Sequence, residues 1–257
     1  MSQNTITAEM SEDHEGVLVV MYNRPPVNAL GIAHIDALST LFSNVSTEFP
    51  DARCMVLTGA GKAFSAGADV KELSVRTTET QLARSVISRG MFDALRRCSI
   101  PVIAAVNGHA LGAGAAMVGC ADIIIASENA KFGLPEVLVG AMGGTRHMAR
   151  FAPAKVMRYM ALTGRQVDAA YLERFGGIQE VTTLENLMPT ALIMAAEIAQ
   201  NSPAISGLMK ESINLTEDMP LTEGYRVEQL FTTLASSMPD AAEASKAFIE
   251  KRKPVWK

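Results

Sequence analysis

The side chain best placed to do chemistry is Glu136, in Phe132-Gly133-Leu134-Pro135-Glu136-Val137-Leu138-Val139. It is the only acidic residue between Asn129 and Val167. Pro135 suits the first position of a helix, which places Glu136 in the first helical turn. In the simpler interpretation, this glutamate only interacts favourably with the helix dipole. In the functional interpretation it is a carboxylate in apolar surroundings, where desolvation raises its pKa toward the range useful for proton transfer.

Two glycine-rich segments, residues 59–69 and 107–116, each follow a predicted strand. They read GAGKAFSAGAD and NGHALGAGAA. Glycines let the backbone approach a ligand closely or adopt positive φ. The second segment runs directly into an apolar helix, so its amides point toward a bound anion with the helix dipole behind them. Two such amide sources that converge on one point would form an oxyanion hole, although each segment is also compatible with a simple tight turn.

Other chemistries fit these segments less well. The glycines of the second segment follow G-x-x-x-G-x-G and not the G-x-G-x-x-G of dinucleotide-binding turns. Ser65 lacks the first glycine of the G-x-S-x-G motif of serine hydrolases. No metal site is predicted, because none of the histidines is spaced from another His or Cys as a ligand pair: His14, His34, His109 and His147.

The elements that must position these residues fall into two groups. The first half alternates predicted strands (17–22, 54–57, 101–106 and 122–126) with predicted helices (32–42 and 78–97). After Gly143, nearly every segment has a helical pattern: 144–151, 155–162, 169–175, 185–200, 204–213, 222–236 and 240–251. We therefore expect an α/β core over residues 1–195 and a helical C-terminal subdomain over residues 196–257, which would serve oligomer contacts and pocket closure.

Composition excludes several classes of function. The chain has 257 residues, 48% of them hydrophobic, and a net charge of −4 with no basic run, so nucleic-acid binding is not expected. No apolar stretch reaches the roughly 18 residues of a membrane span, and the N-terminus lacks a signal-peptide pattern. Three widely spaced cysteines fit reduced core thiols. We expect a cytoplasmic protein with disorder only at its tips, over about the first ten residues.

Several motifs in order resemble the enoyl-CoA hydratase/isomerase (crotonase) superfamily. They are Asn23–Leu30, Leu57–Glu72, Ala105–Asp122, Phe132–Glu136, Gly143–Thr145, Leu162–Gly164 and Ala247–Arg252. The resemblance spans nearly the whole chain. It implies an α/β fold, a crotonase-like spiral of ββα repeats with a helical C-terminal subdomain, assembled as a homotrimer or a dimer of trimers. It also implies an acyl-CoA substrate, with coenzyme A present as part of the thioester and no tightly bound cofactor.

The resemblance also assigns roles to individual residues. The amides of Ala68 and Ala113 would form the oxyanion hole for the thioester oxygen. The residues implied for coenzyme A are Ala66, Asp69, Val70 and Lys71, with Pro26 and Val27 covering the pantetheine, and Lys62 and Lys251 at the phosphates. Either of these last two lysines is also compatible with a merely solvated side chain. Phe231 and Phe248 resemble walls of the acyl pocket, although packing on a helix face explains them equally well.

Departures from the family pattern bear on the reaction. Hydratases with two glutamates carry one where this chain has Ala116, so only Glu136 remains. The loop 140–144 is shorter than usual, and His147 follows it as a further acid, base or surface residue. One glutamate can move a proton between two carbons without water, so we expect an isomerase. A hydratase, hydroxyacyl-CoA lyase or hydrolase that uses Glu136, with or without Tyr225, stays open, as does a catalytically degenerate acyl-CoA-binding or RNA-binding member.

Overall fold

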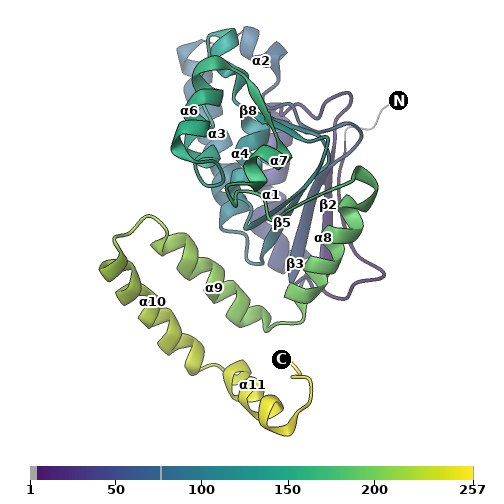
Figure 1. Cartoon of the computed structure of the whole chain (residues 1–257), viewed down its shortest axis with the longest axis vertical. Coiled ribbons are helices and arrows are strands. Elements are labelled where there is room, and N and C mark those ends of the chain that lie inside the picture. Colours follow the sequence, from purple (N-terminus) through teal and green to yellow (C-terminus); the bar gives the residue numbers. More distant parts are fainter. Residues whose placement is uncertain (1–4, 76, 257) are drawn as a thin grey trace.

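The computed structural model describes residues 5–75 and 77–256, and its core is built on two sheets (Figure 1). The six-stranded sheet has the order β1-β2-β3-β5-β7-β10, and the four-stranded sheet has the order β4-β6-β8-β9. The strands of the first are Thr5–Met10, Val17–Asn23, Cys54–Gly59, Val102–Val106, Ile123–Ser127 and Glu180–Thr182. Those of the second are Ala63–Ser65, His109–Leu111, Lys131–Gly133 and Gln166–Asp168. All pairs are parallel except β1 with β2 and β8 with β9.

The chain repeats a strand in the large sheet, a strand in the small sheet and then a helix. β3 and β4 precede α2 (Val70–Ser74) and α3 (Thr78–Arg96). β5 and β6 precede α4 (Ala113–Cys120), and β7 and β8 precede a 3₁₀ helix, η1 (Pro135–Val139). This order confirms the expected spiral of ββα repeats. It also places the turn after each small-sheet strand at one end of the fold, where the glycine-rich segments meet.

Alternate residues of the large sheet enter two separate cores, as the period of two along a strand requires. One face packs against α1 (Ile32–Glu48), α3 and α4; its residues include Leu18, Val20, Met55, Leu57 and Ala104. The other face is covered by α8 (Leu184–Ala199); its residues include Val17, Val56, Ile103, Ile125 and Ala191. Because both faces are covered, β3 is buried along its whole length.

The three last helices extend away from the sheets as an arm (Figure 1). They are α9 (Pro203–Thr216), α10 (Leu221–Ser236) and α11 (Pro239–Glu250). Ion pairs between Lys210 and Asp122 and between Arg96 and Glu217 join the arm to the core. The boundary expected at 195/196 falls inside α8, which stays on the sheet because its apolar face continues to Ala199. The chain leaves the core only after α8.

Other expectations change in detail. The remaining helices are α5 (Thr145–Met148), α6 (Ala154–Thr163) and α7 (Ala169–Glu173). The expected disorder of the first ten residues is wrong for Thr5–Met10, which pairs with β2 along its full length; residues 1–4 lie outside the described part. The three cysteines are free and buried, as expected. Within residues 5–75 and 77–256, no helix combines the length and apolar character needed to cross a bilayer.

Candidate active site

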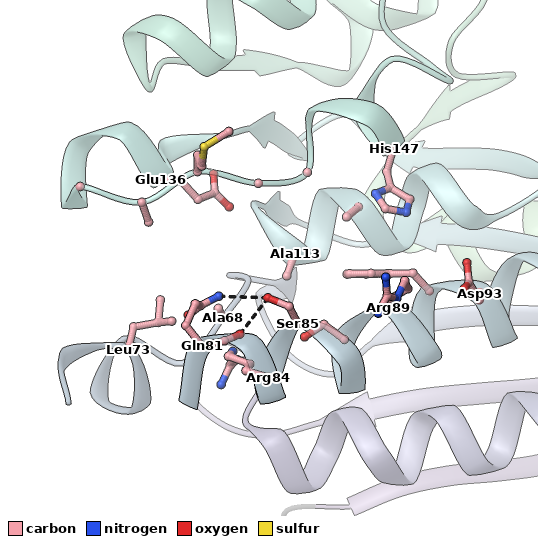
Figure 2. Close-up of a pocket in the computed structure, with 18 residues that line it drawn as sticks. Ala68, Leu73, Gln81, Arg84, Ser85, Arg89, Asp93, Ala113, Glu136 and His147 are labelled. Atoms are coloured by element: carbon pink, nitrogen blue, oxygen red, sulfur yellow. Dashed lines mark hydrogen bonds between the residues drawn. The ribbon is translucent and has the colours of Figure 1, made fainter. Parts of the chain in front are cut away.

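A cavity of about 880 Å³ lies between α3 and the segment that runs from η1 to α5 (Figure 2). Ala68 and Ala113 lie on its wall, and so do Glu136 and Ala116. The structure therefore brings the expected carboxylate and both expected amide residues to one space. These residues come from the turns after β4, β6 and β8, which the ββα repeat places side by side.

The backbone around Ala68 and Ala113 leaves both amides free to donate. The Leu30 amide donates to the Gly67 carbonyl, and the Leu30 carbonyl accepts from the Asp69 amide, so these two bonds lie on either side of Ala68. Ala113 is the first residue of α4, and its amide has no acceptor within the helix. Neither amide has a hydrogen-bond acceptor in the described ranges. Gly67 has φ +88°, and a Cβ built there would lie 3.2 Å from the Ala113 nitrogen and 2.6 Å from the Leu111 carbonyl oxygen. A larger residue would push the two turns apart.

Glu136 lies in η1, with Pro135 at the first helical position as the sequence predicts, although the helix is 3₁₀. Its carboxylate rests against Gly112, where a Cβ would come within 2.1 Å of Oε1. Oε2 is buried with no hydrogen-bond partner in the described part of the chain. Burial raises the pKa of this carboxyl above the usual glutamate range, with only a hydrogen bond from its own backbone acting against it. A glutamate with these properties is suited to accept and return a proton.

The opposite wall is the polar face of α3, which the sequence interpretation missed. Gln81, Ser85, Ser88 and Arg89 line the cavity from this helix, and Arg84 lies below them, bound to Glu72 and to the Leu30 carbonyl. Polar residues recur at positions four apart within 78–97, but such a stripe usually faces solvent. Only the packing of the η1–α5 segment above α3 makes it part of a site.

His147 lies on α5 at the far end of the cavity from Glu136 (Figure 2). Its ring is half-buried and packs against Phe92, with ring centroids 4.8 Å apart. Burial, together with nearby Arg150, lowers the pKa of the imidazole, so it is neutral near pH 7. The loop 140–144 passes along the cavity, with Met142 almost fully exposed.

Most residues expected to contact coenzyme A gather beside this cavity. The Ala66 amide donates to the Val27 carbonyl, so the segment that carries Pro26 lies next to the first glycine-rich turn. Lys62, Val70 and Lys71 are exposed nearby. The Asp69 side chain caps α2 through the Lys71 amide and pairs with Arg24 at 2.5 Å, which lowers the pKa of its carboxyl. Its carboxylate is therefore engaged within the protein.

Four residues of the arm lie elsewhere. Lys251 ends α11, at the opposite end of the molecule from α2 (Figure 1). Phe231, Phe248 and Tyr225 are not among the described residues that line the cavity, and Phe248 is 86% exposed. In a single chain Phe231 and Phe248, the two rings expected to form walls of the acyl pocket, do not line the cavity, because α10 and α11 point away from the core.

Comparisons with known proteins converge on one family. A sequence profile described as enoyl-CoA hydratase/isomerase matches residues 12–257. A Mycobacterium tuberculosis protein named (7aS)-7a-methyl-1,5-dioxo-2,3,5,6,7,7a-hexahydro-1H-indene-carboxyl-CoA hydrolase is 37% identical over 92% of this chain and 96% of its own. The mitochondrial enoyl-CoA hydratase of Pongo abelii is 35% identical over 98% of this chain and 87% of its own. The crystal structure of an enoyl-CoA hydratase from Bacillus anthracis, 30% identical, superposes with a TM-score of 0.92 over 99% of both chains.

Proposed function

The chain belongs to the enoyl-CoA hydratase/isomerase family, and we propose that it shifts the double bond of an enoyl-CoA with Glu136 as its single proton-transfer group. Membership makes it an acyl-CoA-processing enzyme of the crotonase superfamily. The observation that carries the narrower proposal is the half-buried Glu136 carboxylate beside Gly112, with Ala116 where a second carboxylate would be needed.

The proposed reaction uses only groups that line the cavity. The amides of Ala68 and Ala113 donate hydrogen bonds to the thioester oxygen and stabilise the enolate as charge develops there. Glu136 removes a proton from one of the two allylic carbons, and the electron pair moves into the dienolate. The protonated Glu136 then returns a proton to the other carbon, so the double bond shifts with no net gain or loss of atoms. Hydration would need a further group to position and deprotonate water.

We propose that coenzyme A lies beside the first glycine-rich turn. Pro26 and Val27 would cover the pantetheine on one side, and Ala66 with the backbone of Asp69 would contact it on the other. Val70 and Lys71 extend this surface, and Lys62 would meet the phosphates. The hydrogen bond from the Ala66 amide to Val27, which holds the two segments together, supports this arrangement. The thioester is a substrate, and the proposal needs no tightly bound cofactor.

A second candidate is hydrolysis of an oxo-bearing acyl-CoA. Relatives from Mycobacterium tuberculosis and Rhodococcus jostii, 37% and 36% identical, are both named as hydrolases of a dioxo-indene-carboxyl-CoA. The polar wall of α3 suits such a substrate better than it suits an alkyl chain. In this reaction Glu136 would deprotonate water, and the hydroxide would add to a ring ketone bonded to the α-carbon. The carbon–carbon bond between them would then break, which forms a carboxylic acid and leaves a thioester enolate that the same two amides stabilise. The protonated Glu136 would return its proton to the α-carbon, so the net change is the addition of one water.

The test is an assay of 3-hexenoyl-CoA, hexanoyl-CoA and an oxo-acyl-CoA in deuterated buffer, followed by mass spectrometry and the absorbance of the conjugated thioester. We expect conversion of 3-hexenoyl-CoA to the 2-enoyl isomer, with deuterium only at the α- or γ-carbon. A gain of one water from the oxo-acyl-CoA alone would favour the second candidate. If calorimetry detects binding of coenzyme A but the assay shows neither deuterium exchange nor product, both candidate reactions are contradicted, and the chain is a catalytically degenerate acyl-CoA-binding member of the family. The net charge of −4 disfavours RNA binding.

We propose that the arm assembles the chain into a homotrimer or a dimer of trimers. Its helices expose many large apolar side chains, among them Met209, Ile213, Leu221, Leu230, Leu234, Phe248 and Ile249. So much exposed apolar surface on one segment is typical of an interface. Lys251 could serve the phosphates of coenzyme A only in this setting, from α11 of another copy.

Sedimentation equilibrium at micromolar concentration should give three or six times the chain mass of 27.4 kDa. Phe248→Asp, which places a charge on the exposed face of α11, should shift the population toward smaller species. A wild-type protein that sediments as a stable monomer would contradict this proposal.

A further inference from the structure

Arg89 lies in the cavity without a partner, which separates it from the other arginines nearby. Arg84, five residues earlier on α3, is bound to Glu72 at 2.6 Å and to the Leu30 carbonyl. Arg96 and Arg150 share Glu217. No hydrogen bond or ion pair holds Arg89 in the ranges that the structure describes, although it lines the cavity. Its guanidinium therefore has all its N–H donors available for a ligand.

His147 faces Arg89 from the opposite wall (Figure 2). Phe92 packs against the imidazole and orients it, yet neither ring nitrogen has a hydrogen-bond partner within residues 5–75 and 77–256. A neutral imidazole offers one N–H donor and one acceptor. Asp93, one turn after Arg89 on α3, also lines this end of the cavity. Its negative charge offsets the positive charge of Arg89.

These two side chains lie away from the reacting end of the cavity. Gln81 lies on α3 below Glu136, whereas Arg89 lies below His147 (Figure 2). Eight residues separate them, and a helix rises about 1.5 Å per residue, so Arg89 is about 12 Å further along α3. An acyl chain that starts at the amides of Ala68 and Ala113 would reach Arg89 with its distal carbons. If those carbons were purely alkyl, they would desolvate Arg89 and His147 without replacing the hydrogen bonds to water, which is costly.

We propose that Arg89 and His147 form a second polar subsite, which binds an oxygen on the distal part of the acyl group. The substrate class is then an acyl-CoA with a ketone or carboxylate oxygen several carbons from the thioester. This inference rests on the proposed function, because it assumes that the thioester lies at Ala68 and Ala113. Both residues act in specificity, and neither takes part in the proton transfer.

The test measures binding of saturated thioesters that the enzyme cannot isomerise. Octanoyl-CoA, 7-oxooctanoyl-CoA and the mono-CoA thioester of octanedioic acid differ only at the distal end. A matched set of six-carbon thioesters tests how far from the thioester the oxygen must lie to reach Arg89. Calorimetry is performed on wild type, Arg89→Met and His147→Phe, which keeps an aromatic ring on Phe92. Arg97→Met is the matched control, since Arg97 is exposed on the same helix end and does not line the cavity.

Wild type should bind at least one oxygen-bearing thioester about tenfold more tightly than the alkyl thioester of equal length, as one hydrogen bond to a charged group would give. Arg89→Met should abolish this preference and Arg97→Met should keep it. His147→Phe should weaken the ketone more than the carboxylate, and the better of these two ligands identifies the oxygen. Equal binding of all thioesters by wild type, or an unchanged preference in Arg89→Met, would overturn the subsite alone. Failure to bind coenzyme A itself would overturn the proposed function as well.

Discussion

Replacing Glu136 with glutamine is expected to lower turnover by about 10²–10⁴-fold, the usual contribution of a positioned acid or base. Glutamine keeps the shape of the side chain in the narrow space beside Gly112 but cannot accept a proton. The loss should appear in kcat, with the affinity for coenzyme A nearly unchanged, because the carboxylate acts at the acyl carbons. Undiminished turnover of the physiological substrate would remove Glu136 from the mechanism.

The same variant has a stability signature that distinguishes it from simple misfolding. Burial raises the pKa of Glu136 in the folded state, so the folded protein binds this proton more tightly than the unfolded chain does. Its contribution to stability is thus greatest below the unfolded pKa and decreases as pH rises through the folded pKa. When this carboxylate ionises, its buried Oε2 has no hydrogen-bond partner, whereas glutamine carries no charge. Thermal unfolding at pH 7 should therefore show a Tm for Glu136→Gln no lower than that of wild type.

The pH dependence of catalysis follows from the same group. Glu136 must be ionised to accept the proton, so kcat/KM should fall on the acid side with a pKa above the usual glutamate range. Burial lowers the pKa of His147. Because this residue takes no part in the proton transfer, its protonation should not add a second decrease in kcat/KM at acid pH. Comparing the profiles of wild type and His147→Phe checks this assignment.

Glu136 was predictable because a single acidic residue followed a proline at a helix start, a local pattern. The polar wall of α3 was not, because Gln81, Ser85 and Arg89 form the hydrophilic stripe that any surface helix carries. What makes them part of a site is the η1–α5 segment packed above them, and no local pattern in 78–97 encodes that contact. The aromatic rings of the arm show the converse. Phe248 matches a family motif, but its position depends on where α11 lies relative to the core.

The strands show a similar division. The sequence predicts β2, β3 and β5 because each has a run of apolar residues; β3 and β5 are buried on both faces, whereas burial alternates along β2. β4, β6 and β8 have three residues each, too few to show a periodicity in the sequence. Each comes directly after a longer strand of the large sheet and pairs with its neighbours in the second sheet. The position of Thr5–Met10 near a chain end favours disorder, yet pairing of this segment with β2 satisfies the hydrogen bonds of its backbone.

Introducing a glutamate at Ala116 is expected to give the enzyme hydratase activity that the wild type largely lacks. Ala116 lines the cavity, one turn after Ala113 in α4, so a carboxylate there would point toward the space that Glu136 faces. Two nearby carboxylates cannot both ionise easily, so one pKa rises and the pair can hold and activate a water. Hydration of crotonyl-CoA should increase by at least about tenfold in Ala116→Glu, the lower range of acid–base effects.

Ala116→Gln is the matched control, since it adds the same bulk at a site that is only 1% exposed but no carboxylate. If bulk alone disturbs the packing of α4, both variants should lose thermal stability together and neither should hydrate. If a second carboxylate is what the wild type lacks, only Ala116→Glu should hydrate crotonyl-CoA. Combining Ala116→Glu with Glu136→Gln should then abolish the gained hydratase activity, because both carboxylates are needed to hold the water. Efficient hydration of crotonyl-CoA by the wild type would show that the single carboxylate beside Gly112 already suffices, and would replace the isomerase proposal with a one-glutamate hydratase.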